Sequence, residues 1–135
     1  MITGLSHTNI WVLDKDEALA FYRDKLGFDV RQDVTMDGFR WVELGAKGQS
    51  DVALTLNEPG PPMVDEEGSA AIRTLLEKGA ISGGVLKTDD CRATYEELAA
   101  KGVTFLQEPT ERPYGVEAVL RDNSGNWFSL TEPRG

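Results

Sequence analysis

The sequence predicts an α+β fold in which two tandem βαβββ modules make up a single domain spanning residues 1–135. The order strand, helix, strand, strand, strand occurs twice along the chain. In each copy an acidic helix cap is followed, at nearly the same interval, by a glycine that ends the helix: Asp14 and Gly27 in one, Asp90 and Gly102 in the other. An apolar strand follows the glycine in both copies. Since such a repeat signals duplicated structural units, we expect two similar modules.

The first strand of the repeat is expected at Leu5–Leu13, which is rich in β-branched and aromatic residues. Side chains alternate between the two faces of a strand. One face carries Thr8, Ile10 and Val12 and suits packing beneath a helix. The other face mixes polar and aromatic groups, as the wall of a binding cavity would: His7, Asn9 and Trp11.

The remaining elements follow from caps, glycines and apolar runs. One helix, capped by Asp14 or Asp16, runs to about Lys25, and another, capped by Asp89 or Asp90, ends at Gly102. Further strands are expected at Phe28–Val34, Phe39–Leu44, Val52–Leu56, Gly83–Thr88, Val103–Leu106, Val116–Arg121 and Trp127–Thr131. The prolines of Asn57–Asp65 exclude a strand, and Ser69–Lys78 suits a short helix. The resulting parts are module one at about 1–57, a linker with a short helix at about 58–80, and module two at about 81–135.

Composition narrows the class of partner. The net charge is −9 and the isoelectric point is near 4.6, which argues against nucleic acid because phosphates would be repelled. This charge suits cationic or neutral ligands, although it also has the simpler role of keeping a protein soluble. The apolar runs are too short to cross a bilayer, and no export signal precedes Trp11. The single cysteine, Cys91, suits a reducing compartment, so we expect a cytoplasmic protein that binds neither nucleic acid nor membranes.

Several segments together resemble a known family. They are His7–Asp14 with Ala18–Tyr22 and Leu26–Phe28, then Asp90–Gly102, then Arg121–Phe128 with its Asp-Asn-Ser-Gly-Asn turn. These segments resemble the vicinal oxygen chelate superfamily, which includes glyoxalase I, extradiol dioxygenases, and the fosfomycin and bleomycin resistance proteins. The resemblance implies curved mixed sheets around a cavity, the glyoxalase/bleomycin resistance fold. It also implies a homodimer in which the cavity is completed across subunits.

The resemblance also implies where a metal would bind. In metal-dependent members the ligands come from the first and last strands of each module. The corresponding positions here are His7, Leu54, Ser82 or Gly83, and Ser129. Only the imidazole is a good ligand for a transition metal, so we expect no metal, no other cofactor, and a place in the metal-free branch with the bleomycin resistance proteins. A rewired site that joins His7 to Glu43 or Glu117 remains an alternative.

The residues expected to face the cavity are aromatic and apolar, with a few polar groups, which is usual for a small-molecule pocket. We predict these ligand-binding residues: His7, Asn9, Trp11, Phe39, Trp41, Leu54, Tyr114 and Ser129. Each tryptophan has a simpler interpretation as core or interface packing, and this applies most to Trp127. The sequence shows no serine-histidine-acid motif, Walker-type loop or CxxC motif.

These observations favour a metal-free protein that sequesters a planar aromatic or antibiotic-like molecule, which would give drug resistance by binding. No catalytic residue is assigned under this hypothesis. One alternative is a lyase or oxygenase with a non-standard metal site. Another is metal-independent chemistry with His7 as the base, and a regulatory or structural role is also open.

Overall fold

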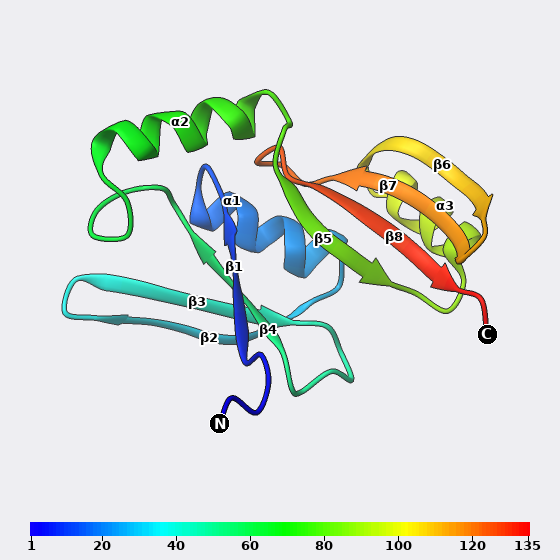
Figure 1. The fold of residues 1–135 in the computed structure, drawn as a ribbon, viewed down its shortest axis with the longest axis horizontal. Coiled ribbons are helices and arrows are strands. Elements are labelled where there is room, and N and C mark those ends of the chain that lie inside the picture. The colour runs from blue at the N-terminus through cyan, green and yellow to red at the C-terminus, as the bar shows by residue number, and fades with distance from the viewer. The chain divides into compact units, whose positions relative to one another are not determined.

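The computed structural model describes residues 1–135, and its first unit, Met1–Arg73, is built on one four-stranded mixed sheet. The strand order is β1-β4-β3-β2, with β1 parallel to β4 and the other neighbours antiparallel (Figure 1). The strands are β1 (His7–Trp11), β2 (Asp29–Met36), β3 (Phe39–Gly45) and β4 (Ala53–Asn57). All four predicted strands of module one are therefore present, with shifted ends.

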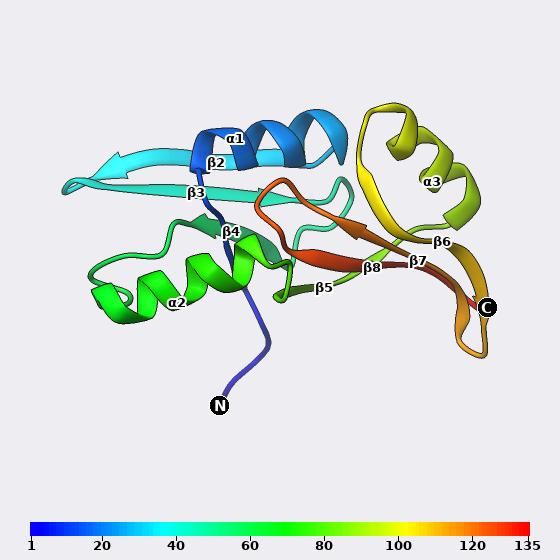
Figure 2. The same cartoon turned by 90° about the horizontal axis from the view of Figure 1, so that it is seen from above.

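A helix covers one face of this sheet, as Figure 2 shows. It consists of α1 (Lys15–Ala20) and a π-helical continuation, η1 (Phe21–Lys25). Asp14, not Asp16, is the cap, because its Oδ1 accepts a hydrogen bond from the Glu17 N–H at 2.9 Å. The core between this helix and the sheet is mainly apolar and includes Ile10, Val12, Ala18, Phe21 and Tyr22. Thr8, which we expected on this packed face, stays exposed near the start of β1.

The second unit, Thr74–Gly135, repeats the plan. Its sheet has the order β5-β8-β7-β6, and β5 is parallel to β8. Its elements are β5 (Ser82–Lys87), α3 (Cys91–Ala100), β6 (Thr104–Arg112), β7 (Gly115–Arg121) and β8 (Trp127–Pro133). Asp90 caps α3 by accepting from the Ala93 N–H at 3.0 Å, and α3 packs on β6, β7 and β8. The repeated topology confirms the α+β class and the two βαβββ modules.

A helix joins the two repeats, and its start was predicted a few residues too late. α2 (Glu66–Glu77) begins three residues before the predicted Ser69. The reason is Asp65, whose Oδ1 accepts from the Gly68 N–H at 2.7 Å and so satisfies a free donor of the first turn. The boundary between the two units falls inside this helix, after Arg73.

The turn before β8 is organised by one buried carboxylate. Asp122 Oδ1 accepts hydrogen bonds from the backbone N–H groups of Ser124, Gly125 and Asn126, each at 2.9 Å. Gly125 has φ +109°, and a Cβ there would run into the carbonyl oxygen of Leu76. A glycine is therefore required where this turn meets the end of α2.

β6 is the element that the sequence predicts least well. It continues to Arg112, whereas the apolar pattern that predicts it stops at Leu106. The extension consists of polar residues and one proline, Pro109, on an edge strand, and its register against β7 shifts around Gln107. Edge strands need no alternating apolar face, so the pattern carries no signal there.

Candidate functional site

Strand register decides which side chains of the first unit share a face. His7 is paired with Ala53, Asn9 with Thr55, and Glu43 with Thr55. Paired residues on neighbouring strands point to the same side of a sheet. The sheet face opposite the helix-covered core therefore carries His7, Asn9 and Glu43, and alternation along β3 adds Trp41.

The centre of this face is a hydrogen-bonded group that we call the His7 cluster: Ser6, His7, Trp41 and Glu43. His7 Nε2 lies 2.9 Å from Glu43 Oε1, and Trp41 Nε1–H donates to the same oxygen at 3.1 Å. The imidazole and the Trp41 rings meet edge to face, with centroids 5.8 Å apart. The two aromatic rings and the carboxylate therefore hold one another in place.

The electrostatics of the cluster keep Glu43 ionised. The Trp41 N–H bond, helped by the His7 bond and the nearby Arg31 charge, holds the pKa of the Glu43 carboxyl below its usual value. An ionised carboxylate can only accept hydrogen bonds. In the neutral imidazole Nε2 therefore carries the proton, and Nδ1 accepts from the Ser6 hydroxyl at 2.9 Å.

A pocket of about 460 Å³ opens beside the cluster, entirely within the first unit. It is lined by His7 and Glu43, by Arg31, and by the loop that runs from Gly48 to Val52. Arg31 holds this loop, because its guanidinium donates to the carbonyl oxygens of Val52 and Ala46, each at 3.1 Å, and also to that of Gln49. The pocket wall is therefore tied to β2.

Three other predicted residues of the first unit lie outside the His7 cluster and do not line this pocket. Asn9 Oδ1 accepts from Asn57 Nδ2 at 2.6 Å, and Trp11 is half-buried in the next cavity-face position of β1. Phe39 lines a second pocket of about 310 Å³, where the Lys15 ammonium lies 4.7 Å from its ring centroid. Burial lowers the pKa of Lys15.

Leu54 is not on this face, which corrects its sequence assignment. It is paired with Thr8 and with the fully buried Leu44, so its side chain points to the opposite side of the sheet from His7. The β4 residues that do share the face of His7 are Ala53 and Thr55, on either side of Leu54. Because side chains alternate with period two, an error of one residue in the register moves a residue to the wrong face.

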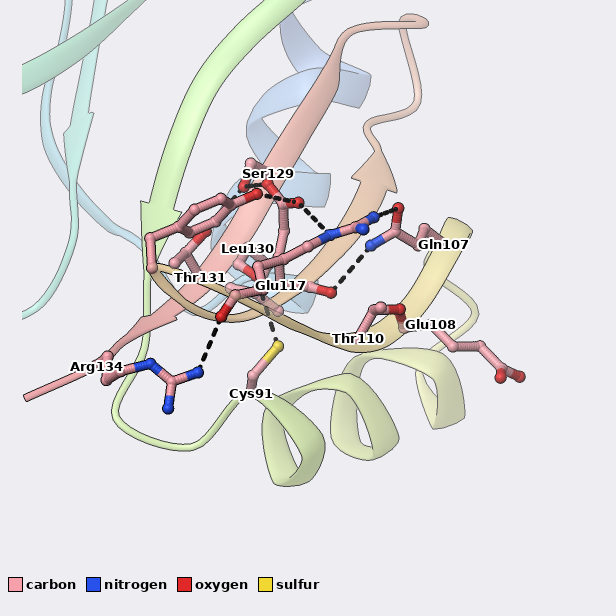
Figure 3. Close-up of polar contacts among 11 residues, drawn as sticks. Cys91, Gln107, Glu108, Thr110, Glu117, Ser129, Leu130, Thr131 and Arg134 are labelled. Atoms are coloured by element: carbon pink, nitrogen blue, oxygen red, sulfur yellow. Dashed lines mark hydrogen bonds and ion pairs between the residues drawn. The ribbon is translucent and has the colours of Figure 1, made fainter.

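In the second unit the corresponding face is centred on Glu117 (Figure 3). Ser129 Oγ donates to Glu117 Oε2 at 2.6 Å, and the Tyr114 hydroxyl donates to Oε1 at 2.7 Å. Arg112 Nε lies 3.6 Å from Oε1. These partners, with the Ser129 bond foremost, hold the pKa of the Glu117 carboxyl below its usual value, and Glu117 in turn raises that of Tyr114.

This network extends along three strands of the sheet. Ser129 Oγ lies 2.8 Å from Thr131 Oγ1 on β8, while Arg112 donates to Gln107 Oε1 at 3.0 Å on β6. The structure therefore brings Tyr114 and Ser129, both predicted from the sequence, onto one carboxylate. Glu117 is paired with Thr131 just as Glu43 is paired with Thr55, so the two carboxylates occupy equivalent positions of the repeat.

The residues present do not fit a metal centre of the kind that the family resemblance implies. The neighbour of His7 on the last strand of module one is Ala53, and the neighbour of Ser129 on the first strand of module two is Val85. By strand pairing, the expected ligand positions therefore fall on Ala53, in place of Leu54, and on Val85, in place of Ser82 or Gly83. The side chains of Ala53 and Val85 have no atom that can coordinate a metal ion. No group of three or more His, Cys, Asp or Glu residues is arranged to hold a metal ion.

The hydrogen-bonded line of Ser6, His7 and Glu43 was not predicted from the sequence. No serine-histidine-acid motif is visible in the chain, because Glu43 comes from a strand that is distant in sequence. The only signal was parity: Trp41 and Glu43 share a face of β3. Prediction of the Glu117 network would have required the register of β7 against β8, and the alternation of side chains along one strand does not give that register.

Comparison with known proteins agrees with the fold. The sequence model of the Glyoxalase/Bleomycin resistance protein/Dioxygenase superfamily matches residues 4–130. YurT of Bacillus subtilis (strain 168) is 35% identical over 129 residues, which cover 93% of this chain and 95% of YurT. No helix has the length and apolar character needed to span a membrane.

Two solved structures are similar over nearly the whole of both chains. UcmS2 is 53% identical with a TM-score of 0.93, and the match covers 98% of this chain and 99% of UcmS2. TnmS3, an antibiotic binding protein from Streptomyces sp. CB03234, is 28% identical with a TM-score of 0.79, and the match covers 98% of each chain.

Proposed function

Because this chain belongs to the Glyoxalase/Bleomycin resistance protein/Dioxygenase superfamily, we propose that it binds a planar aromatic or antibiotic-like small molecule and captures it without converting it. Sequestration of an antibiotic in this way would give resistance by binding. The superfamily alone does not decide this, since one scaffold hosts unrelated activities.

The observation that carries the proposal is the pairing of Trp41 with Glu43 beside the 460 Å³ pocket. The volume lies within the range usual for small-molecule sites. Trp41 is half-buried and is not itself a lining residue, but it contacts two residues that line the pocket, His7 and Glu43. Stacking of one aromatic ring contributes about 0.5–1.5 kcal/mol beyond the burial of area. Its N–H bond to Glu43 fixes the indole, so little side-chain entropy is lost on binding.

Similarity to TnmS3 supports the same proposal. TnmS3 is an antibiotic binding protein, and it is similar to this chain along its whole length. The lack of a fitting metal donor set is a further support, because glyoxalase and dioxygenase chemistry depends on a metal as Lewis acid.

Titration of the protein with bleomycin-like and polycyclic antibiotics, followed by tryptophan fluorescence, tests the proposal. We expect saturable quenching with at least one polycyclic compound, and a weaker response in Trp41→Leu. Trp127→Phe, on the other unit, is the matched variant that controls for loss of one fluorophore. Flat titrations across a broad panel would contradict the proposal.

One observation favours a second candidate function, metal-independent catalysis with His7 as base. A histidine held between a hydroxyl and a carboxylate, each at 2.9 Å, has the geometry that a general base needs. Mass spectrometry of a bound compound after long incubation separates the two candidates. An unchanged compound supports capture; conversion that disappears in His7→Ala supports catalysis. Elemental analysis that finds a transition metal at one ion per chain would favour the remaining alternative, a non-standard metal site.

We also propose that the protein is a cytoplasmic homodimer in which the partner copy completes the cavity, as the family resemblance implies. The buried, unpaired Cys91 suits a reducing compartment. Sedimentation velocity at high protein concentration tests the dimer, and a monomer throughout would refute it. Cell fractionation tests the compartment.

A further inference from the structure

We propose that the ligand of the His7 cluster carries a protonated amino group, which binds to Glu43 while its aromatic system stacks on Trp41. This inference rests on the proposed function, because it names the class of compound that the same site would take. It follows from the state of the Glu43 carboxylate.

The two oxygens of Glu43 are in different situations. Oε1 accepts from both His7 and Trp41, whereas Oε2 has no hydrogen-bond donor within the chain. The Glu43 side chain is only 12% exposed. Oε2 is not among the fully buried atoms that lack a partner, so it stays open to a donor from outside the chain, and a charged donor is the one that an ionised carboxylate favours most. Since Glu43 lines the pocket, a bound ligand can supply that donor.

The charges around the pocket favour a cationic donor. Two carboxylates, Glu43 and Asp51, line it against one guanidinium, that of Arg31. Three of the five guanidinium N–H donors of Arg31 bind backbone carbonyls of the pocket loop, so this side chain mainly holds the loop in place. An ammonium group would pair with Glu43 by a charge-assisted hydrogen bond, which is stronger than a neutral one.

The equivalent carboxylate of the second unit shows the contrast. Both oxygens of Glu117 have donors within the chain, Tyr114 on Oε1 and Ser129 on Oε2. Glu117 therefore has little need for an external donor, although it occupies the same position of the repeat. The free acceptor is specific to Glu43, which lies two residues from Trp41 on the same strand face.

Four anthracene derivatives of nearly equal size test this inference by isothermal titration calorimetry. They are 9-(aminomethyl)anthracene, which is cationic, the neutral 9-(hydroxymethyl) and 9-methyl compounds, and anthracene-9-carboxylate, which is anionic. We expect the amine to bind about 10- to 100-fold more tightly than the methyl compound, from the usual strength of a hydrogen bond to a charged group. The carboxylate should bind most weakly of the four.

Variants assign the preference to one side chain. Glu43→Gln, which keeps the shape and an acceptor oxygen, should reduce the preference for the amine to about threefold or less, while the methyl compound binds as before. That unchanged binding shows that the variant is folded. Glu96→Gln, which removes an exposed charge of α3, should retain the full preference and controls for net charge.

The outcomes separate the inference from the function on which it rests. If all four compounds bind equally well, or if Glu43→Gln keeps the preference, the inference is wrong and the proposed function stands. If none of the four binds, both the inference and the capture of planar aromatic compounds are wrong.

Discussion

Replacement of Glu117 by alanine tests the polar network of the second unit. Three donors lose their acceptor, but they differ in exposure: the Tyr114 residue is 53% exposed and the Arg112 side chain 40%, so water can replace their bonds. Only the Ser129 hydroxyl is in a buried residue, and it keeps Thr131 as a partner. The loss is therefore close to one charge-assisted hydrogen bond, about 2 kcal/mol in the free energy of unfolding.

Differential scanning calorimetry and urea denaturation measure this loss. A decrease of about 2 kcal/mol corresponds to a fall in Tm of roughly 5–10 °C for a chain of this size. The matched control is Glu111→Ala, which breaks ion pairs with Arg92 and Arg134 but starts from a side chain that is 65% exposed. Surface ion pairs contribute little, so we expect less than about 0.5 kcal/mol there. Equal losses in the two variants would refute the reasoning.

The same variant predicts a pH dependence. The pKa of the folded Glu117 carboxyl lies below its ordinary value of 4.5, chiefly because of Ser129. A carboxyl whose pKa is depressed by folding stabilises the folded state above its ordinary pKa, and this stabilisation disappears as the pH falls through the folded value. The difference in stability between the wild type and Glu117→Ala should therefore be largest near pH 7 and shrink below pH 4.5. A difference that is unchanged at pH 3 would contradict this account.

Other predictions concern the turn and the ligand face. Asp122→Ala removes an acceptor from three backbone N–H groups and should cost about 3 kcal/mol in urea denaturation; a loss under about 1 kcal/mol would show that water replaces the carboxylate. Gly125→Ala drives a Cβ against the Leu76 carbonyl and should destabilise strongly, whereas Gly60→Ala, in open space, should change Tm by no more than about 2 °C. Trp41→Phe should retain most of the binding of a planar compound and Trp41→Leu should lose about three- to tenfold, as calorimetry would measure; equal losses would mean that the indole N–H, not the ring face, matters.

The elements were predictable where one physical rule acts locally. Asp14 and Asp90 cap helices because their carboxylates accept hydrogen bonds from N–H groups three residues later. An acidic residue just before a helical pattern predicts such a cap in both modules. Gly27 and Gly102 follow those helices with positive φ, as expected for glycines after a last turn. The class of fold follows from these repeated signals.

The site was less predictable because it depends on register. Alternation placed Trp41 and Glu43 on one face of β3, as the structure has them, but it could not say which residue of β4 lies beside His7. It therefore chose Leu54, whose neighbour across the sheet is the buried Leu44. The register of β4 against β1 and β3 is set by hydrogen bonds between residues far apart in the sequence. A short stretch of sequence therefore does not reveal it.

The most direct test of the account is an NMR titration of protein labelled with ¹⁵N at its three tryptophans. Each indole N–H gives one signal, and three Trp→Phe variants assign them. As a polycyclic ligand is added, the account predicts that the signal of Trp41 shifts most, because its N–H donates to Glu43 at the edge of the pocket. The account would be contradicted if the same sample showed saturable binding of the ligand while the chemical shift of the Trp41 indole N–H did not change.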